Sequence, residues 1–333
     1  MKSNLLKYGI AIVLSAGALY LAFRGQNFDS LLAIIKQANV WFILLALALQ
    51  LIAHYIRAWR WQFLLRPVKP KIGTYNSFKA VVAGYGLNNI IPRAGELVRP
   101  AMIAQSEAIP FSSALATIVL ERILDVVALG SIFALSLYLF QEEFMTAFPD
   151  IAKNSLAGLF IISAFLIFFV VVLVNKTISN MLINMMRKFL PQKIDNLFVN
   201  AFGTFTKGLH GLSRDTILPI IIGTVGVWLF YTLSTFASIF ILPGSGIENI
   251  GFSGAIAILA LTGVSITIPT PGGLGTFHYF ISRALNSFFF IPLPTAIAFA
   301  TISHSSNYIV VTLLGVFYMV RAGVSIKGAK KTV

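Results

Sequence analysis

The stretch that decides the fold is ITIPTPGGLGTFHYF, residues 266–280, which lies between two strongly apolar runs. It contains two prolines, three glycines and a histidine, and no acidic residue. Proline and glycine interrupt helices, so the stretch predicts a break within a membrane-like helical region. Non-helical backbone at membrane depth persists only where it is buried in protein or lines a wet cavity. We therefore expect a functional site near this break.

The composition predicts a membrane protein. Of the 333 residues, 57% are hydrophobic and 11% are charged, whereas soluble domains carry roughly 25% charged residues. The apolar runs approach the ~20 residues that cross a bilayer, which predicts an all-α polytopic protein with one membrane domain over residues 1–333. A β-barrel would show short alternating segments instead. The chain has no cysteine, which excludes disulfides and thiol nucleophiles, and its four scattered histidines predict neither a metal site nor a cofactor.

Six full spans are predicted, near residues 5–23, 40–65, 111–141, 155–175, 216–242 and 293–320. The first could be a signal peptide, but its long apolar run and the lack of a clear cleavage site favour an uncleaved span. Two further apolar regions, 77–109 and 251–290, are broken by Pro and Gly. We expect each of them to form a hairpin that enters and leaves by one face of the membrane, and the sequence does not decide whether it is re-entrant or fully spanning.

The basic residues predict the orientation of the spans. Residues 57–79 carry six basic residues and no acid, and residues 176–215 carry six basic and two acidic residues. The positive-inside rule then predicts that both termini lie in the cytoplasm of a prokaryotic plasma membrane, and it explains the net charge of +14 without nucleic acid. Residues 176–215 also predict amphipathic helices lying on an anionic lipid surface, with a solvated helical hairpin as the alternative.

Two short motifs suggest an internal repeat. Each half, about 40–141 and about 216–321, is predicted to contain a span, a broken hairpin and a second span. The motifs I-P-x-x-G and I-P-x-x-[ST]-A recur in the same order, at residues 91–95 and 268–272 and at residues 109–114 and 291–296. The predicted orientation makes the halves inverted repeats, an architecture in which transporters build substrate sites from broken helices. The alternative is that Pro and Gly only kink packed helices.

Ionisable residues in and beside the predicted spans are candidates for substrate binding. Such residues are costly in a membrane and tend to face a cavity or a partner. Arginine suits phosphate because its guanidinium binds it as a bidentate fork, with nearby acids holding it in place. Internal salt bridges that lock a hairpin to a span are the alternative. The candidates in the first half are Arg93, Glu96, Arg99, Glu121, Arg122 and Asp125.

The second half offers polar residues with almost no charge. The glycines of the opening stretch provide backbone freedom, and helix N-termini near such a break expose N–H groups that favour anions. The histidines could titrate near neutral pH, although a lone histidine is more often a hydrogen-bonded packing residue. The candidates here are Gly272, Gly273, Gly275, His278, His304 and Asn307.

Three stretches carry a resemblance to a known family: NNIIPRAGELVRP at residues 88–100, the E-R-x-x-D of residues 121–125, and IPTPGGLGTFHYF at residues 268–280. Together they resemble the flippase-like membrane domain of lysylphosphatidylglycerol synthases over nearly the whole chain. Family members often carry Glu at the position of His278, so a role that the family has at this position does not carry over directly to His278. In the full synthases a soluble domain transfers lysine from charged tRNA to phosphatidylglycerol, and the membrane domain is associated with moving the product between leaflets. Because the chain ends at Val333, soon after the last predicted span, the resemblance implies translocation without the transferase.

The favoured function is a lipid translocase that moves an anionic or zwitterionic phospholipid, or a polyprenyl-linked lipid. Its expected partners are membrane lipid and either a lipid-modifying enzyme or a second copy of the chain, and not nucleic acid. No GxxxxGK[ST] loop is present to bind ATP. A membrane-embedded transferase with Glu121 and Asp125 as general base is the first alternative. A non-catalytic partner of such an enzyme is the second.

Overall fold

The computed structural model describes residues 2–147, 175, 177–178, 181, 184–185 and 214–323. The predicted span over 155–175 and nearly all of the predicted amphipathic linker over 176–215 lie outside the described residues. The described residues form α-helices and two short 3-10 helices, with no strand among them. These elements are α1 (Lys2–Phe23), α2 (Phe28–Ile35), α3 (Val40–Leu65), α4 (Thr74–Ile90), α5 (Gly95–Glu107), α6 (Phe111–Leu139), α7 (Gln141–Ala147), α11 (Arg214–Ser238), η1 (Ile247–Ile250), α12 (Gly251–Thr267), η2 (Pro271–Gly273), α13 (Thr276–Phe289) and α14 (Leu293–Arg321).

The helices confirm an all-α polytopic membrane protein. Four helical segments are long and apolar enough to cross a bilayer: Val40–Leu65, Asp215–Ser238, Ile247–Thr267 and Leu293–Arg321. The number rises to six if each of two bent helix pairs counts as one span, since α1 meets α2 at 89° and α6 meets α7 at 95°. The described part of the chain therefore has four to six candidate spans. Ile247–Thr267 is one of the four, although the sequence analysis assigned it to a hairpin arm of undecided depth.

Local sequence explains where several helices begin and end. The Asn27 side chain accepts hydrogen bonds from the N–H groups of Asp29 (2.9 Å) and Ser30 (3.2 Å) at the start of α2, a common N-cap arrangement. Ala108 (φ 52°) and Phe290 (φ 54°) end α5 and α13 in the left-handed region. Each is followed by an Ile-Pro pair, after which a 29-residue helix begins. The second recurring motif therefore has the same local structure in both halves.

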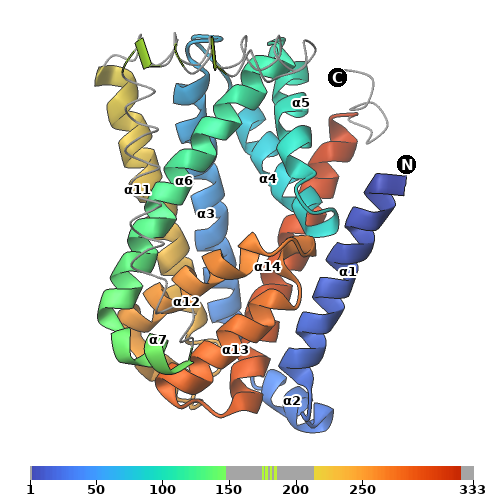
Figure 1. Cartoon of the computed structure of the whole chain (residues 1–333), viewed down its shortest axis with the longest axis vertical. Helices are drawn as coiled ribbons and strands as arrows, with labels where there is room; N and C mark the ends of the chain where they lie inside the picture. Colours follow the sequence, from blue (N-terminus) through green and yellow to red (C-terminus); the bar gives the residue numbers. More distant parts are fainter. Residues whose placement is uncertain are drawn as a thin grey trace.

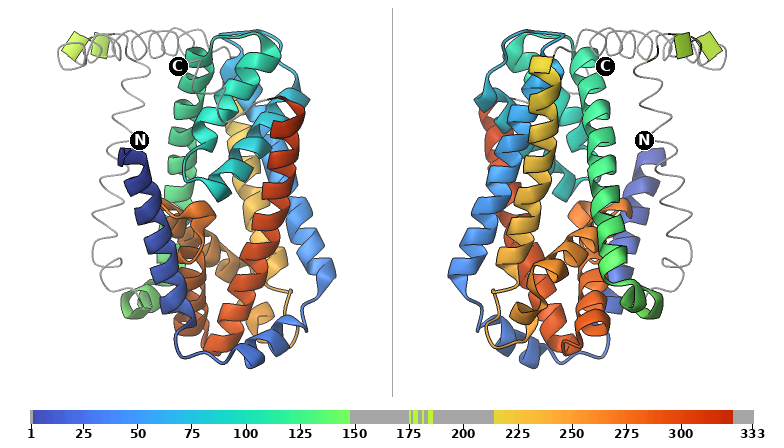
Figure 2. Two further views of the ribbon diagram at one scale, coloured as in Figure 1. Left: turned by 90° about the vertical axis from the view of Figure 1, so that its right-hand side faces the viewer. Right: turned by 90° about the vertical axis from the view of Figure 1, so that its left-hand side faces the viewer.

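Two broken hairpins, α4–α5 and α12–α13, meet near the middle of the molecule (Figure 1). The open end of α4–α5 lies at the end of the molecule where α14 finishes, and the open end of α12–α13 lies at the opposite end (Figures 1 and 2). Their breaks, residues 91–94 and 268–275, coincide with the predicted Pro and Gly stretches. At the meeting point, a Cβ on Gly272 would lie 2.7 Å from the Asn89 side-chain oxygen and 2.8 Å from the Tyr308 ring. A residue without a side chain is thus required there.

Separate apolar clusters hold the two ends of the molecule. One cluster joins α4, α5 and the adjoining parts of α3, α6 and α14, with Trp61, Leu65 and Ile103 fully buried. The other joins α12, α13 and the start of α14, with Phe299 and Ile281 fully buried. The start of α1 and the end of α14 lie toward the same end of the molecule (Figure 1). The charged candidates of the first half belong to the end that contains the first cluster.

Candidate functional site

Two arginines that the sequence analysis counted among the basic residues of 57–79 lie inside the protein. Arg57 and Arg60 belong to α3, and their exposed fractions are 2% and 0%. Both lie within the predicted span over 40–65, and the positive-inside count treated them as charges at the membrane surface, whereas they are buried beside acids of α6. A spacing of three residues places both on one face of the helix, and that face is turned toward α6. This spacing, next to the polar His54 in an otherwise apolar span, was the available signal.

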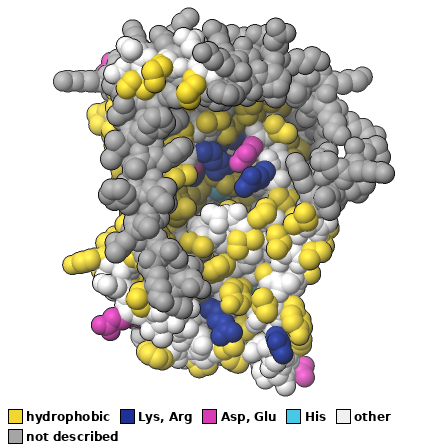
Figure 3. All heavy atoms as spheres, viewed as in Figure 1, with side chains coloured by type: hydrophobic (Ala, Val, Ile, Leu, Met, Phe, Trp, Pro, Cys, Tyr) yellow, Lys and Arg dark blue, Asp and Glu magenta, His cyan; other side chains and the backbone are white. Residues whose placement is uncertain are grey.

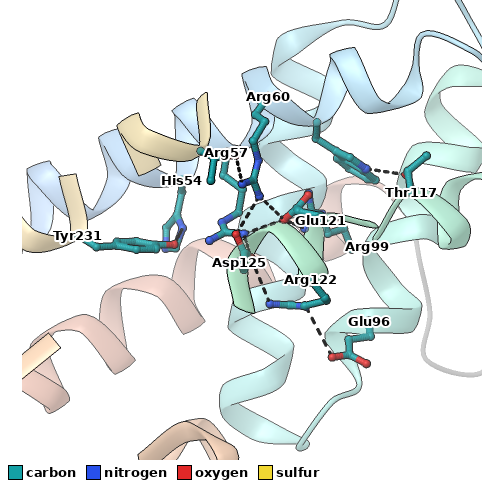
Figure 4. A network of polar contacts seen from close by, with 12 residues as sticks. His54, Arg57, Arg60, Glu96, Arg99, Thr117, Glu121, Arg122, Asp125 and Tyr231 are labelled. Carbon is teal, nitrogen blue, oxygen red and sulfur yellow. Dashed lines mark hydrogen bonds and ion pairs between the residues drawn. The ribbon is translucent and has the colours of Figure 1, made fainter. Parts of the chain in front are cut away.

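The buried arginines surround two acids of α6 (Figure 4). Arg99 of α5 donates two hydrogen bonds to Glu121, at 2.7 and 2.5 Å. Arg57 donates to Glu121 at 2.8 Å and also to Asp125. Arg60 donates to Asp125 at 3.0 Å and lies 3.5 Å from Glu121. These five side chains join α3, α5 and α6 through three positive and two negative charges.

Aromatic and hydroxyl side chains complete the walls of this network. The Arg99 guanidinium lies 4.0 Å from the centre of the Trp61 ring, a cation–π contact. The Trp61 indole N–H donates to Thr117 at 2.8 Å. Arg57 lies 5.7 Å from the ring centres of Tyr85 and Tyr231. These contacts place aromatic rings beside two of the guanidinium groups, those of Arg57 and Arg99.

Arg122 and Glu96 form the exposed edge of the same network. Arg122 Nε lies 3.9 Å from Glu96 Oε1, and Arg122 Nη1 lies 3.9 Å from Asp125 Oδ2. The exposed fractions of the Arg122 and Glu96 side chains are 39% and 44%. Both line a small, shallow pocket that is open to the surface and whose wall also contains Arg99, Tyr85 and Asn88. Figure 3 shows a recess on this face of the molecule with basic and acidic side chains at its base.

Arg93 does not join the network. It lies in the break between α4 and α5 with φ 63°, its side chain is exposed, and it makes no ion pair with any described residue. Arg93, Glu96 and Arg99 are spaced three residues apart, a spacing that would place all three on one side of a continuous helix. Since α5 begins at Gly95, Arg93 precedes the helix and that periodicity does not reach it.

The candidates of the second half form another group, around the break between α12 and α13. His304 Nε2 lies 2.9 Å from the Gly272 carbonyl oxygen, and the rings of His304 and His278 are 5.0 Å apart. Gly275 (φ 87°) lies against α1, where a Cβ would come within 2.5 Å of the Ser15 carbonyl oxygen. Gly273 is also buried, and Asn307 lies half-buried on α14 with its side-chain oxygen unpaired. Between the two groups, α4 contacts both η2 and α14: Gly272 lies against Asn89, and the Tyr308 hydroxyl donates to the Asn89 carbonyl oxygen at 2.7 Å.

The chemistry of the first group is suited to binding an anion. Among the described residues, no cluster of three or more metal-ligating side chains occurs. The charged network contains four guanidinium groups, which are the protein groups best suited to bidentate binding of phosphate or carboxylate. Its acids are Glu96, Glu121 and Asp125, so the network carries one positive charge more than negative charges.

Comparison of the sequence with known proteins identifies the family of the chain. A UPF0104 membrane protein of Methanocaldococcus jannaschii is 25% identical to the chain over 341 residues, covering 96% of both. A UPF0104 membrane protein of Methanothermobacter thermautotrophicus is 29% identical over 119 residues, covering 35% of this chain and 34% of that protein. The lysylphosphatidylglycerol synthase TM region matches residues 8–315, which include every charged residue of the network. The chain belongs to the lysylphosphatidylglycerol synthase TM region family.

Proposed function

We propose that the protein is a lipid translocase and that Arg122 binds the anionic part of a lipid headgroup. The observation that carries this proposal is a difference between the four arginines of the network. Arg57, Arg60 and Arg99 each donate a hydrogen bond to a buried acid. Arg122 approaches acids only at 3.9 Å, beyond hydrogen-bonding distance, whereas an unpartnered Nε is common to all four arginines. Arg122 therefore retains donors for a ligand, and it lines the open pocket.

The arrangement of the hairpins supports translocation. We propose that the halves 40–141 and 216–321 are inverted repeats, since their broken hairpins open toward opposite ends and meet at Gly272 and Asn89. Transporters with this architecture expose a site near the membrane midplane to each side in turn. The pocket at Arg122 lies beside one of these breaks. In this proposal the protein resides in a prokaryotic plasma membrane with both termini in the cytoplasm.

The transferase alternative receives less support from the geometry. A general base needs an oxygen that is free to accept a proton from the substrate. Both oxygens of Glu121 accept hydrogen bonds from guanidinium groups, and so do both oxygens of Asp125. Glu121 is also fully buried. These acids position the arginines, and neither carboxylate has an oxygen left free to accept a proton from a substrate.

Translocation can be tested in liposomes that carry a fluorescent phospholipid in both leaflets, with dithionite added outside. Native protein should allow bleaching well beyond half of the signal, and Arg122→Gln should return it toward half. Arg122 is the right target because its half-exposed side chain can be replaced without opening the buried network. Arg283→Gln is the matched control, since Arg283 is exposed on α13 and makes no ion pair with a described residue.

The result that would refute the proposal is bleaching that stops near half for native protein with every phospholipid and polyprenyl-linked lipid supplied. Equal bleaching by native protein and Arg122→Gln would refute the role of Arg122. Conversion of lipid to a new product on incubation with a polar donor, detected by mass spectrometry, would favour the transferase instead.

A further inference from the structure

Glu96 differs in exposure and distance from the acids that hold the buried arginines, Glu121 and Asp125. Its carboxylate faces Arg122 across 3.9 Å, and both side chains are close to two-fifths exposed. Both belong to the wall of the same open pocket. Figure 4 shows the pair at the edge of the network, with Glu96 reaching Arg122 from the side away from Asp125. The pair is thus loose, accessible and located at the mouth of the charged network.

The contrast with the buried pairs is one of geometry. Arg99 holds Glu121 in a two-bond fork at 2.7 and 2.5 Å, with almost no exposure of either side chain. A fork of this kind is strong and directional. The contact between Glu96 and Arg122 has no hydrogen bond of acceptable length, and exposed pairs are worth little. An anion that offers Arg122 a proper fork would therefore displace Glu96 at small cost.

We infer that Glu96 is the resident counterion of Arg122 and that the phosphate of a lipid headgroup replaces it there. This inference rests on the proposed function. A carboxylate and a phosphate present the same pair of acceptor oxygens to a guanidinium, so each can take the other's place. The four arginines exceed the three acids by one positive charge.

Such an exchange makes Glu96 a selectivity residue. A lipid without an anion leaves Glu96 against Arg122, and a lipid with a phosphate exchanges one negative partner for another. The displaced carboxylate needs no buried position, because it already faces the open side of the pocket. Glu96 therefore weakens the binding of every anion at Arg122, and most of all that of anions unable to form a fork.

The test is a double-mutant cycle on binding. Purified protein is titrated with short-chain phosphatidylglycerol, with the matching diacylglycerol as the phosphate-free probe, and separately with inorganic phosphate. Glu96→Gln should bind phosphatidylglycerol about two- to fivefold more tightly, the range expected for losing a half-exposed ion pair. Arg122→Gln should bind it about tenfold or more weakly, since a charge-assisted hydrogen bond is lost. In the Arg122→Gln background, Glu96→Gln should change nothing.

Two further variants separate exchange from other effects. Glu142→Gln removes one exposed negative charge from α7 and should leave the affinity unchanged. Glu96→Asp retains a carboxylate and should restore most of the native affinity. The inference is overturned if Glu96→Gln weakens binding, because Glu96 would then be holding Arg122 in place for the ligand. It is also overturned if Glu142→Gln, or Glu96→Gln in the Arg122→Gln background, strengthens binding as much as Glu96→Gln alone.

The source of the phosphate and the proposed function are tested separately. Inorganic phosphate that binds as tightly as phosphatidylglycerol would assign the site to a water-soluble phosphate and overturn the lipid assignment. Translocation is measured on the same preparations. If the double-mutant cycle gives the expected affinities but no lipid is translocated, the proposed function is refuted and the exchange at Arg122 stands. If lipid is translocated but Glu96→Gln has no effect on binding, the exchange alone is refuted.

Discussion

Replacing Glu121 with glutamine should destabilise the protein more than any other single change in the charged network. Glutamine has the shape of glutamate and lacks its charge, so the change leaves the packing almost intact. Glu121 is fully buried and accepts hydrogen bonds from Arg57 at 2.8 Å and from Arg99 at 2.7 and 2.5 Å, with Arg60 only 3.5 Å away. Among the described residues, Asp125 would remain as the only acid in direct contact with the buried arginines Arg57 and Arg60.

The expected cost follows from the charges that remain. Three buried arginines face two acids in the native protein, and they would face one acid in Glu121→Gln. Breaking a buried ion pair by removing one partner costs about 3–5 kcal/mol, because the other charge is left uncompensated. The glutamine amide adds to this cost, since its NH₂ group would face guanidinium donors. For a chain of this length, a loss of this size corresponds to a fall in Tm of roughly 4–7 °C.

The assay is thermal unfolding of purified protein in detergent, followed by intrinsic fluorescence and by loss of the monodisperse elution peak. Glu142→Gln, an exposed change on α7, is the control and should melt with the native protein. The double change Arg99→Gln with Glu121→Gln should recover part of the loss, because it replaces a charged pair with a neutral one. A Tm of Glu121→Gln within about 1 °C of the native value would refute the reasoning, since a buried acid that holds three arginines cannot be neutral in effect.

Three more predictions concern the α4–α5 hairpin. Burial alone would raise the pKa of Glu107, but hydrogen bonds from Asn76, Lys69 and the Gly73 N–H outweigh burial and lower that pKa. The carboxylate of Glu107 therefore contributes its full stabilisation above the unfolded pKa of about 4.3. This stabilisation is lost as the pH falls through the lower pKa of the folded state. Unfolding curves at neutral pH should thus show Glu107→Gln to be about 1–3 kcal/mol less stable than the native protein, with the difference shrinking in acid. Gly86→Ala should lower Tm, at a cost of about 1–3 kcal/mol, because its Cβ would lie 2.8 Å from a backbone oxygen of α14. Arg93→Gly should leave phosphatidylglycerol binding unchanged and should not lower Tm, since residue 93 has φ 63° and stands outside the network; a loss of binding would return Arg93 to the site.

The breaks in the hairpins were predictable because their signals are local. Proline lacks the N–H that a helix needs, and glycine lowers helix stability. Residues 91–95 and 268–275 therefore predict helix breaks whatever the tertiary structure around them. The acids of α6 were predictable for a similar reason, since charges within an apolar span need a partner or a cavity. The expectation that these acids have partners did not identify the partners, since Arg57, which pairs with Glu121, lies 64 residues away in the sequence. Long-range pairing of this kind leaves no trace in local spacing.

The positive-inside rule hid the most buried arginines of the site. It counts basic residues near the end of a span and treats them as solvent-exposed. Arg57 and Arg60 lie near the end of α3, yet acids from another helix compensate their charges inside the protein. Counting could not tell the two situations apart, because it contains no information on which helix lies beside α3. The sequence HYIRAWRW, with polar and aromatic residues among the charges, was the only hint.

The two hairpins are held by different forces, and this difference bears on how a translocase of this kind would work. Moving α4–α5 away from α6 would separate Arg99 from Glu121, and Glu107 also ties the end of α5 to the start of α4 through Gly73 and Asn76. Charges separated in an apolar medium are costly. The α12–α13 hairpin is held mainly by apolar contacts around Ile281 and by the bond between His304 and the Gly272 carbonyl. Lipid tails can replace apolar protein contacts at little cost, since they are as apolar as the side chains that they meet. In the proposed translocation cycle, α4–α5 is therefore the static hairpin that carries the anion site, and α12–α13 is the one that moves.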